Sequence, residues 1–159
     1  MNNGMKAIGI KMVDLKPMNA KDAVNAGYRV SNNGEIIPPF TEGYEVTYPD
    51  GYKSWCPKKV ADAAYYKLSE ANDGSKILKE DVMNFITDVD TITVGEKSTV
   101  INAHTITGFD TIAHSSCVDP KNYDKEIGKT YAMEKVIDAT WGHLGFVLQW
   151  AINGLKRDN

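Results

Sequence analysis

The sequence predicts an α+β protein, in which a small antiparallel β-meander packs with a long C-terminal helix and is preceded by a small α+β N-terminal module. Short β-rich runs separated by turn residues fill the middle of the chain. A helical pattern then runs from Asp119-Pro120 almost to the C-terminus. With 159 residues, 42% of them hydrophobic, the chain has the size of one ordinary domain or two small ones. We expect modules at residues 1–68 and 78–159, joined by a polar linker at 69–77.

The first module should begin with a strand and a short helix. Residues 6–15 alternate loosely between apolar and polar, which predicts a strand that ends before Lys16-Pro17. Asn19 is a suitable N-cap for a helix over residues 20–27, and Gly27 would close that helix.

A hairpin and a second helix are expected next. Two aromatic and β-branched runs flank a Pro-Asp-Gly turn within residues 43–55. The helix over residues 57–68 would have Pro57 in its first turn and Ser54 or Cys56 as its cap. The side chains expected to face the sheet are Val60, Ala64 and either Tyr65 or Leu68.

The second module should open with a helix over residues 78–86. Three β-rich runs separated by turn residues then predict an antiparallel meander. These runs are residues 89–94, 98–107 and 109–115. The final helix is expected to run to about Leu155, with Asn153-Gly154 as its stop signal.

The final helix carries apolar residues on two faces. A helix on one small sheet buries a single stripe, so the second face needs another helix, the first module or another subunit. We expect a homo-oligomer built on this helix. The alternative is a two-helix hairpin folded on its own core. One face comprises Ile127, Tyr131, Ile137, Trp141, Leu144, Leu148 and Ala151, and the other Met133, Val136, Thr140, Phe146, Val147 and Trp150.

Composition argues against several classes of protein. The formal net charge is −3, so duplex nucleic acid is not an expected partner. No apolar run has the length of a membrane span and the polar N-terminus is not a signal peptide, so we expect a cytoplasmic protein without a membrane partner. Cys56 and Cys117 lack metal-site spacing and indicate reduced thiols, with one long-range disulfide as the alternative.

The sequence shows no catalytic arrangement. A Ser-His-Asp set, a P-loop and a GxGxxG motif are missing, and the three histidines lack metal-ligand spacing. We therefore expect no enzyme activity, no metal and no cofactor.

The joint between the last strand and the final helix is the first candidate site. Ser115 and Ser116 precede a helix start whose free N–H groups could bind an anion such as phosphate. The alternative is that Asp119 or Asn122 caps the helix. Asn122, Tyr123 and Lys125 could hold a nucleobase or ribose by stacking and hydrogen bonds. Alternatively, Tyr123 is a core anchor and the lysines form a solvated face.

The end of the final helix is the second candidate site. Arg157 lies close to Asn153 and Gln149 in a chain that has few arginines. Its guanidinium could bind phosphate in a bidentate manner, or it could simply neutralise the helix dipole.

Residues 88–154 resemble a family of small tailed-phage proteins, the "gp forty-nine" family, above all in the run TVINAHTITGFDTIAHSSCVDPKNYDKEIGKTYAMEKVIDATW. The shared pattern is a hairpin ending in GF, an S-S-C-V-D-P-x-N-[FY]-D joint, E-I-G, and a W-x-x-x-G-F/Y-x-L tail. The same region is similar to the Thoeris anti-defence family of the first type described.

That resemblance implies a phage protein that binds cyclic ADP-ribose isomers, and in some members cyclic oligonucleotides, without degrading them. It also implies dimers and higher oligomers whose pockets form between subunits, in the cytoplasm of an infected bacterium. By position, it places the pocket at Asn122 and Tyr123 together with Gln149, Asn153 and Arg157. The alternative function is an adaptor whose aromatic N-terminal module docks a host protein.

Overall fold

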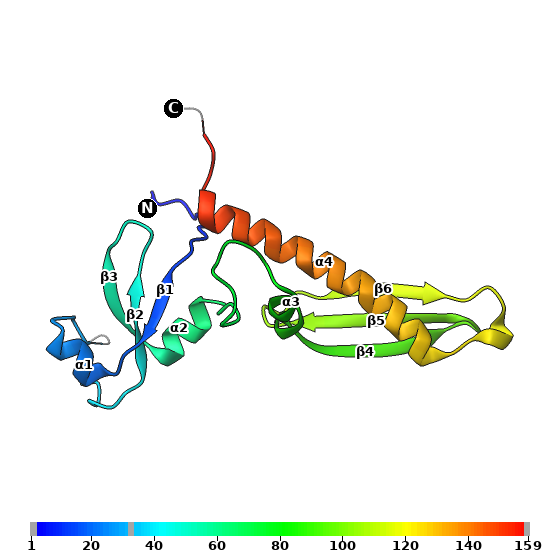
Figure 1. The fold of residues 1–159 in the computed structure, drawn as a ribbon, viewed down its shortest axis with the longest axis horizontal. Helices are drawn as coiled ribbons and strands as arrows, with labels where there is room; N and C mark the ends of the chain where they lie inside the picture. The colour runs from blue at the N-terminus through cyan, green and yellow to red at the C-terminus, as the bar shows by residue number, and fades with distance from the viewer. Residues whose placement is uncertain (1–2, 32–33, 158–159) are drawn as a thin grey trace. The chain divides into compact units, whose positions relative to one another are not determined.

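The computed structural model describes residues 3–31 and 34–157, which form two compact units (Figure 1). One unit groups the residues up to Lys67 with those from Gln149 onward, and the other spans Leu68–Leu148. Each unit contains a three-stranded antiparallel sheet, and a long helix follows the second sheet in the chain. The predicted α+β class is confirmed.

The sheet of the first unit is built around a hairpin, as predicted. Strands β2 (Gly43–Thr47) and β3 (Lys53–Pro57) pair with each other, and β1 (Asp14–Pro17) pairs with the other edge of β2. The turn is closed by a 2.9 Å hydrogen bond from the Tyr48 amide to the Tyr52 carbonyl. Gly51 adopts a φ of 86° within it, a conformation that a residue with a Cβ rarely takes.

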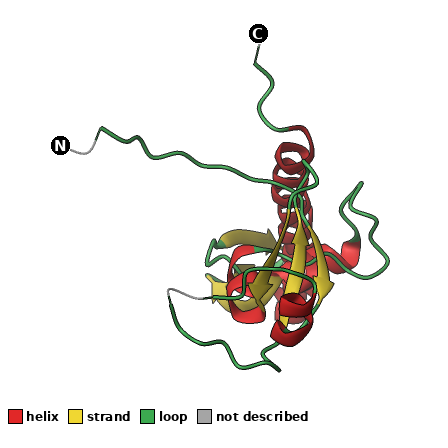
Figure 2. Ribbon diagram, turned by 90° about the vertical axis from the view of Figure 1, so that its left-hand side faces the viewer, coloured by secondary structure: helices red, strands yellow, loops and turns green. Residues whose placement is uncertain are grey.

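The prediction of a strand over residues 6–15 is wrong. The strand begins only at Asp14 and continues through Lys16 to Pro17, and the stretch before it is drawn as loop in Figure 2. Strand β1 pairs with residues 44–47 of β2, and the turn between β2 and β3 begins directly after Thr47. Pro17 is tolerated because β1 lies at the edge of the sheet, where a missing N–H removes no ladder bond.

The first predicted helix is confirmed. The second helix is present, but its predicted cap and its predicted buried residues are wrong. In α1 (Ala20–Asn25) the Asn19 side chain accepts a 2.8 Å hydrogen bond from the Asp22 amide, as a cap should. Helix α2 (Lys58–Ala64) has no side-chain cap, because Ser54 and Cys56 belong to β3. Its buried residue is Ala61, whereas two expected core positions, Val60 and Ala64, are exposed. The helix ends after two turns, so it buries one small residue rather than a longer stripe.

The second unit contains the predicted helix and meander. Helix α3 (Lys79–Phe85) leads directly into β4 (Ile86–Val94), which pairs with β5 (Ser98–Thr105). Strand β6 (Thr111–Ser116) pairs with the other edge of β5.

The polar segment 69–77 is organised by one buried carboxylate, that of Asp81, which is 1% exposed. It accepts hydrogen bonds from the amides of Ser69 and Leu78 at 2.7 and 2.8 Å, and from the Asn72 side chain at 2.6 Å. Burial by itself raises the pKa of Asp81, but these hydrogen bonds outweigh it and the net pKa is lowered. A charged Asp81 therefore holds this segment on the first turn of α3.

The first part of helix α4 (Lys125–Asn153) lies on one face of the β4-β5-β6 sheet, and the later part runs beyond it (Figure 1). The core between them contains Ile101 and Ala103 of β5 with Ala132 and Val136 of α4. The helix is continuous through Gly142 and Gly145, so the two-helix hairpin considered from the sequence is wrong.

The two apolar faces expected on α4 do not match the stripe that is buried. The buried residues are Ala132, Val136, Thr140 and Leu144, one in each successive turn. Val136 and Thr140 come from one expected face and Leu144 from the other. Small or short side chains let the helix lie close to the sheet, whereas the bulkier members Ile127, Tyr131 and Phe146 are 56–67% exposed.

Candidate ligand-binding site

The two serines at the end of β6 point to opposite faces of the sheet. Ser115 pairs with Thr99, which lies on the face that α4 covers, and is half-buried. Ser116 is exposed on the other face, where its hydroxyl lies 2.7 Å from that of Ser98. Because successive strand residues alternate in direction, the structure does not bring Ser115 and Ser116 to a single ligand.

Three backbone N–H groups at the joint donate hydrogen bonds to aspartate carboxylates. Asp119 accepts a 3.0 Å hydrogen bond from the Lys121 amide at the start of the short 3-10 helix η1 (Pro120–Asn122). Asp124 accepts from the amides of Glu126 and Ile127 at 2.9 and 3.0 Å, and so caps α4. Capping therefore holds, with Asp119 as expected and with Asp124 in place of Asn122. These three amides are therefore not free to bind an anion.

The predicted single helix from Asp119-Pro120 is in fact interrupted at Tyr123 and Asp124. The sequence carried a signal for this, since an Asp directly before the apolar periodicity is a common N-cap. Proline at the start of η1 concealed the later helix start.

Tyr123 is anchored to the sheet through its hydroxyl group. That oxygen lies 2.8 Å from Thr93 Oγ1 and 3.0 Å from Thr99 Oγ1. The anchor expected as one alternative is therefore present, which leaves the ring, but not the hydroxyl, for contact with a ligand. Neither threonine was singled out from the sequence, because only the register of β4 and β5 places them together. Asn122 and Lys125 are exposed beside Tyr123 in the chain.

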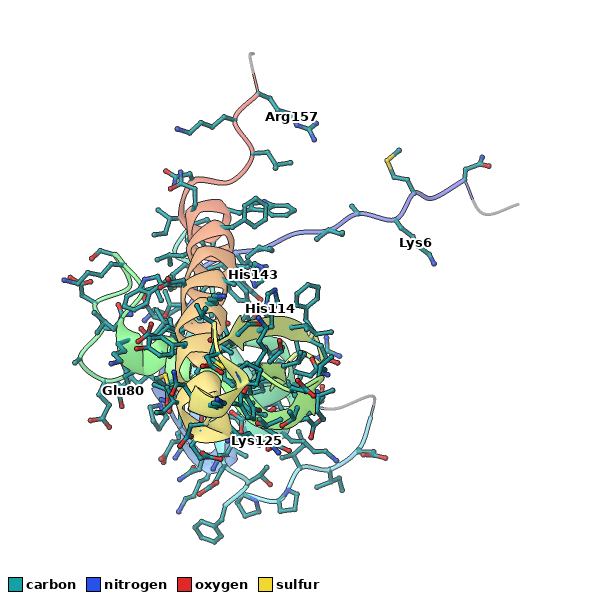
Figure 3. The ribbon with its side chains drawn as sticks, turned by 90° about the vertical axis from the view of Figure 1, so that its right-hand side faces the viewer. Lys6, Glu80, His114, Lys125, His143 and Arg157 are labelled. Carbon is teal, nitrogen blue, oxygen red and sulfur yellow. The ribbon has the colours of Figure 1, made fainter. Side chains whose placement is uncertain are left out.

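The second group of predicted residues lies at the end of α4. Gln149 and Asn153 are exposed, and the Asn153 side-chain amide donates a 2.9 Å hydrogen bond to the Gln149 carbonyl. Gly154 then ends the helix with a φ of 63°, as predicted. Arg157 lies beyond this end and is exposed (Figure 3).

Helix α4 separates the two groups of residues. Lys125 and Asn153 are its first and last residues, so the helical rise places their Cα atoms about 42 Å apart. A small nucleotide cannot contact both ends of one such helix. A pocket that uses both groups therefore requires two copies of the chain.

Two open hollows lie in the first unit, and neither is lined by a predicted ligand residue. The larger has a volume of about 530 Å³ and is lined in part by Asn19, Phe40, Tyr44 and Lys58. The second, of about 480 Å³, shares Glu42 and Lys58 with it. These two residues form an exposed ion pair at 3.1 Å.

Two further features bear on the chemistry of the chain. Among the residues that the structure describes, no three His, Cys, Asp or Glu side chains gather to hold a metal ion. None of the helices in that same part of the chain combines the length and the apolar character needed to cross a membrane.

Comparison with known proteins gave one match. The model of a family described as "Phage protein (N4 Gp49/phage Sf6 gene 66) family" matches residues 70–152. The matched region includes the β4-β5-β6 sheet, the joint and almost all of α4. Searches of curated proteins and of solved structures found nothing similar.

Proposed function

Because the chain belongs to the Phage protein (N4 Gp49/phage Sf6 gene 66) family, we propose that it is a phage or prophage anti-defence protein that sequesters cyclic nucleotide immune signals. It would bind cyclic ADP-ribose isomers, and cyclic oligonucleotides as a second group, without degrading them. The observation that carries the proposal is the extent of the family match. It includes Ser115, Ser116, Asn122, Tyr123, Lys125 and Gln149 among the predicted ligand residues, and it ends one residue before Asn153.

The separation of the two ligand groups supports a pocket shared between subunits. The joint supplies an aromatic ring at Tyr123 and a cation at Lys125, and the helix end supplies the guanidinium of Arg157. Stacking on the ring and charge-assisted hydrogen bonds to phosphate are the contacts that a nucleotide needs. In the proposed assembly, the joint of one subunit faces the helix end of another.

The outward side of α4 supports assembly through this helix. Ile127 and Tyr131 are 57% and 56% exposed, and Trp141 is 39% exposed. Large apolar side chains exposed along one helix are typical of a surface that another subunit covers. The proposed homo-oligomer, a dimer or a larger assembly such as a hexamer, would bury them.

The first test is a screen of the purified protein against cyclic ADP-ribose isomers and cyclic di- and trinucleotides. Thermal shift should show a saturable rise in Tm, and native mass spectrometry should show ligand bound to an oligomer. Ligand released by heat should be chemically intact, because sequestration needs no bond cleavage. No shift with any of these compounds, on a folded oligomer, would overturn the proposal, and a cleaved product would indicate an enzyme.

Matched variants test the site itself. Arg157→Ala should weaken binding at least tenfold, because a charge-assisted phosphate contact is lost. Lys156→Ala removes the same charge from the adjacent residue and should have little effect. Tyr123→Phe should lower stability by about 1 kcal/mol through the lost hydroxyl contacts, yet retain binding, because the ring remains. Equal losses of nucleotide affinity in the Arg157 and Lys156 variants would mean that the ligand is held only by non-specific electrostatic attraction.

A protein-binding adaptor is the second candidate, and one observation favours it. Ile36 and Phe40 of the first unit are 96% and 78% exposed, and Phe40 lines the larger hollow. Apolar side chains exposed to this degree can anchor a protein partner. The adaptor function would replace nucleotide sequestration under two conditions. No nucleotide binds to the protein, and a host protein binds the wild type but not the Ile36→Asp and Phe40→Asp variants.

A further inference from the structure

The face of the β4-β5-β6 sheet that α4 does not cover carries a histidine held between two carboxylates. His104 of β5 lies with Nε2 2.8 Å from an oxygen of Asp90 on β4. Its Nδ1 lies 2.7 Å from an oxygen of Asp110, just before β6. Asn102, on the same face of β5, donates a 3.3 Å hydrogen bond to the other oxygen of Asp110. The His104 side chain is 34% exposed, so water and protons reach it.

The two contacts define the charge on the ring. An ionised carboxylate only accepts hydrogen bonds, so both ring nitrogens must donate. A neutral imidazole carries a single N–H and would set a lone pair against one carboxylate. The geometry therefore selects the imidazolium form. In agreement, the hydrogen bonds to Asp90 and then to Asp110 raise the pKa of His104. The hydrogen bonds from His104 and then from Asn102 lower the pKa of Asp110.

The contacts join parts of the sheet that are distant in sequence. Asp90 and His104 come from neighbouring strands, and Asp110 comes from the turn between β5 and β6. The same turn is held by a 2.7 Å hydrogen bond from the Thr105 hydroxyl to the Phe109 carbonyl. The Phe109 ring packs edge-on against His143 of α4, with 5.5 Å between ring centroids. The position of this turn therefore affects a contact on α4.

A further charged group on this face is Asp88, the register partner of His104 on β4. The Asp88 carboxylate accepts a 2.8 Å hydrogen bond from the Val89 amide, so it is directed to its own backbone. On β6, His114 lies on the same face but opposite Val100, further along the sheet. With a neutral ring at position 104, the carboxylates of Asp90 and Asp110 would both face a group that no longer carries a positive charge, which is unfavourable.

We propose that Asp90, His104 and Asp110 form a pH-sensitive latch that holds the β5–β6 turn, and with it Phe109, in place while the imidazolium keeps both protons. Loss of one proton opens the latch. The turn then loosens, while the rest of the sheet and its core with α4 remain folded. The device lies on the face opposite to α4, and its operation does not depend on the proposed nucleotide function.

The pH window follows from the direction of each shift. The pKa of His104 is higher in the folded chain, so its stabilising effect is fully present below the unfolded value of about 6.5 and is lost as pH rises through the folded pKa. The pKa of Asp110 is lower in the folded chain, so its effect is present above about 3.9 and is lost as pH falls through the folded value. The latch is therefore closed between about pH 3.9 and 6.5, and it opens as pH rises through the folded pKa of His104.

The test is nuclear magnetic resonance on the full chain. Long-range nitrogen–proton correlation should show both ring nitrogens of His104 protonated at low pH, with a titration midpoint above about 6.5. Asp90→Asn combined with Asp110→Asn should move that midpoint down. Amide exchange at residues 105–111, corrected for its intrinsic pH dependence, should accelerate several-fold as pH passes through the midpoint. His114→Asn, which removes a histidine from the same face outside the latch, should leave both results unchanged.

Two outcomes would overturn the latch. One is a titration midpoint of His104 at or below about 6.5 in the folded wild type. The other is a charged His104 whose titration leaves exchange at residues 105–111 unchanged, which would reduce the contacts to passive surface pairs. Both are read on the wild-type chain, so a variant that fails to fold does not affect the decision.

Discussion

At the scale of single residues, Gly128 determines how closely α4 approaches the sheet. A Cβ added at this position would meet the Thr99 side chain, with 2.8 Å to its Cβ. Thr99 is fully buried and its hydroxyl also lies beside the Tyr123 hydroxyl, so it cannot easily move away. Gly142, in the same helix, is exposed, and a Cβ added there would meet no packed group of the described chain within 4 Å.

This difference predicts opposite effects of the same substitution. Gly128→Ala should destabilise the protein by about 1–3 kcal/mol, because overpacking outweighs the better helix propensity of alanine. Gly142→Ala should stabilise it by up to about 1 kcal/mol, since only the propensity changes. Urea unfolding of both variants measures the two values. Similar effects at the two positions would contradict the close approach at Gly128.

At the scale of elements, helix α4 has a defined cap at each end. The Asp124 carboxylate accepts from two amides of the first turn, and Gly154 ends the helix with a positive φ. Between these caps, the helix packs Ala132 and Val136 against the sheet and exposes larger apolar groups elsewhere. The caps therefore determine where the helix begins and ends, whereas the sheet determines which side is buried.

The N-terminal cap can be tested by its removal. Asp124→Ala should lower the free energy of unfolding by about 1 kcal/mol, because two first-turn amides lose their acceptor. Asp138→Ala, an exposed position in the middle of the same helix, removes the same charge and should leave stability unchanged or slightly higher. Thermal unfolding by circular dichroism at 222 nm, which is sensitive to helix content, provides the comparison. An equal loss in both variants would assign the effect to charge alone.

At the scale of the whole molecule, the proposed ligand residues fall into two groups that one chain cannot join. The joint group includes Asn122 and Lys125, and the end group includes Arg157, with α4 between them. If each pocket combines the joint of one subunit with the helix end of another, two defective variants can complement each other.

The experiment mixes two inactive variants after unfolding and refolding them together. Asn122→Ala with Lys125→Ala, and separately Arg157→Ala, should each bind the nucleotide poorly. Mixed oligomers should recover binding in the fraction of pockets that receive both wild-type groups, about a quarter for random assembly into dimers with one pocket at each end. Isothermal titration of the mixture against each parent gives that fraction. Failure to recover binding, with mixed oligomers present by native mass spectrometry, would contradict a shared pocket.

Local signals in the sequence were sufficient for much of the fold. Some signals act only through neighbouring backbone groups, as do Asn19, the Pro-Asp-Gly turn and Asn153-Gly154. The start of α1, the turn between β2 and β3 and the end of α4 were therefore predicted correctly. The predicted β1 failed because the length of a strand depends on its partner, and β2 is short. The caps of α2 and α4 were misplaced because a strand extended further in one case and a 3-10 turn intervened in the other.

The candidate site shows the same division between local and long-range information. The sequence by itself determined the α+β class, the meander and the presence of a long helix, because periodicity and turn chemistry are local. The candidate ligand residues stay predictions. Only the tertiary structure decided that Ser115 and Ser116 face apart, that Tyr123 is tied to Thr93 and Thr99, and that His104 lies between Asp90 and Asp110. These relations depend on strand register and helix placement, which arise from contacts between residues far apart in the chain.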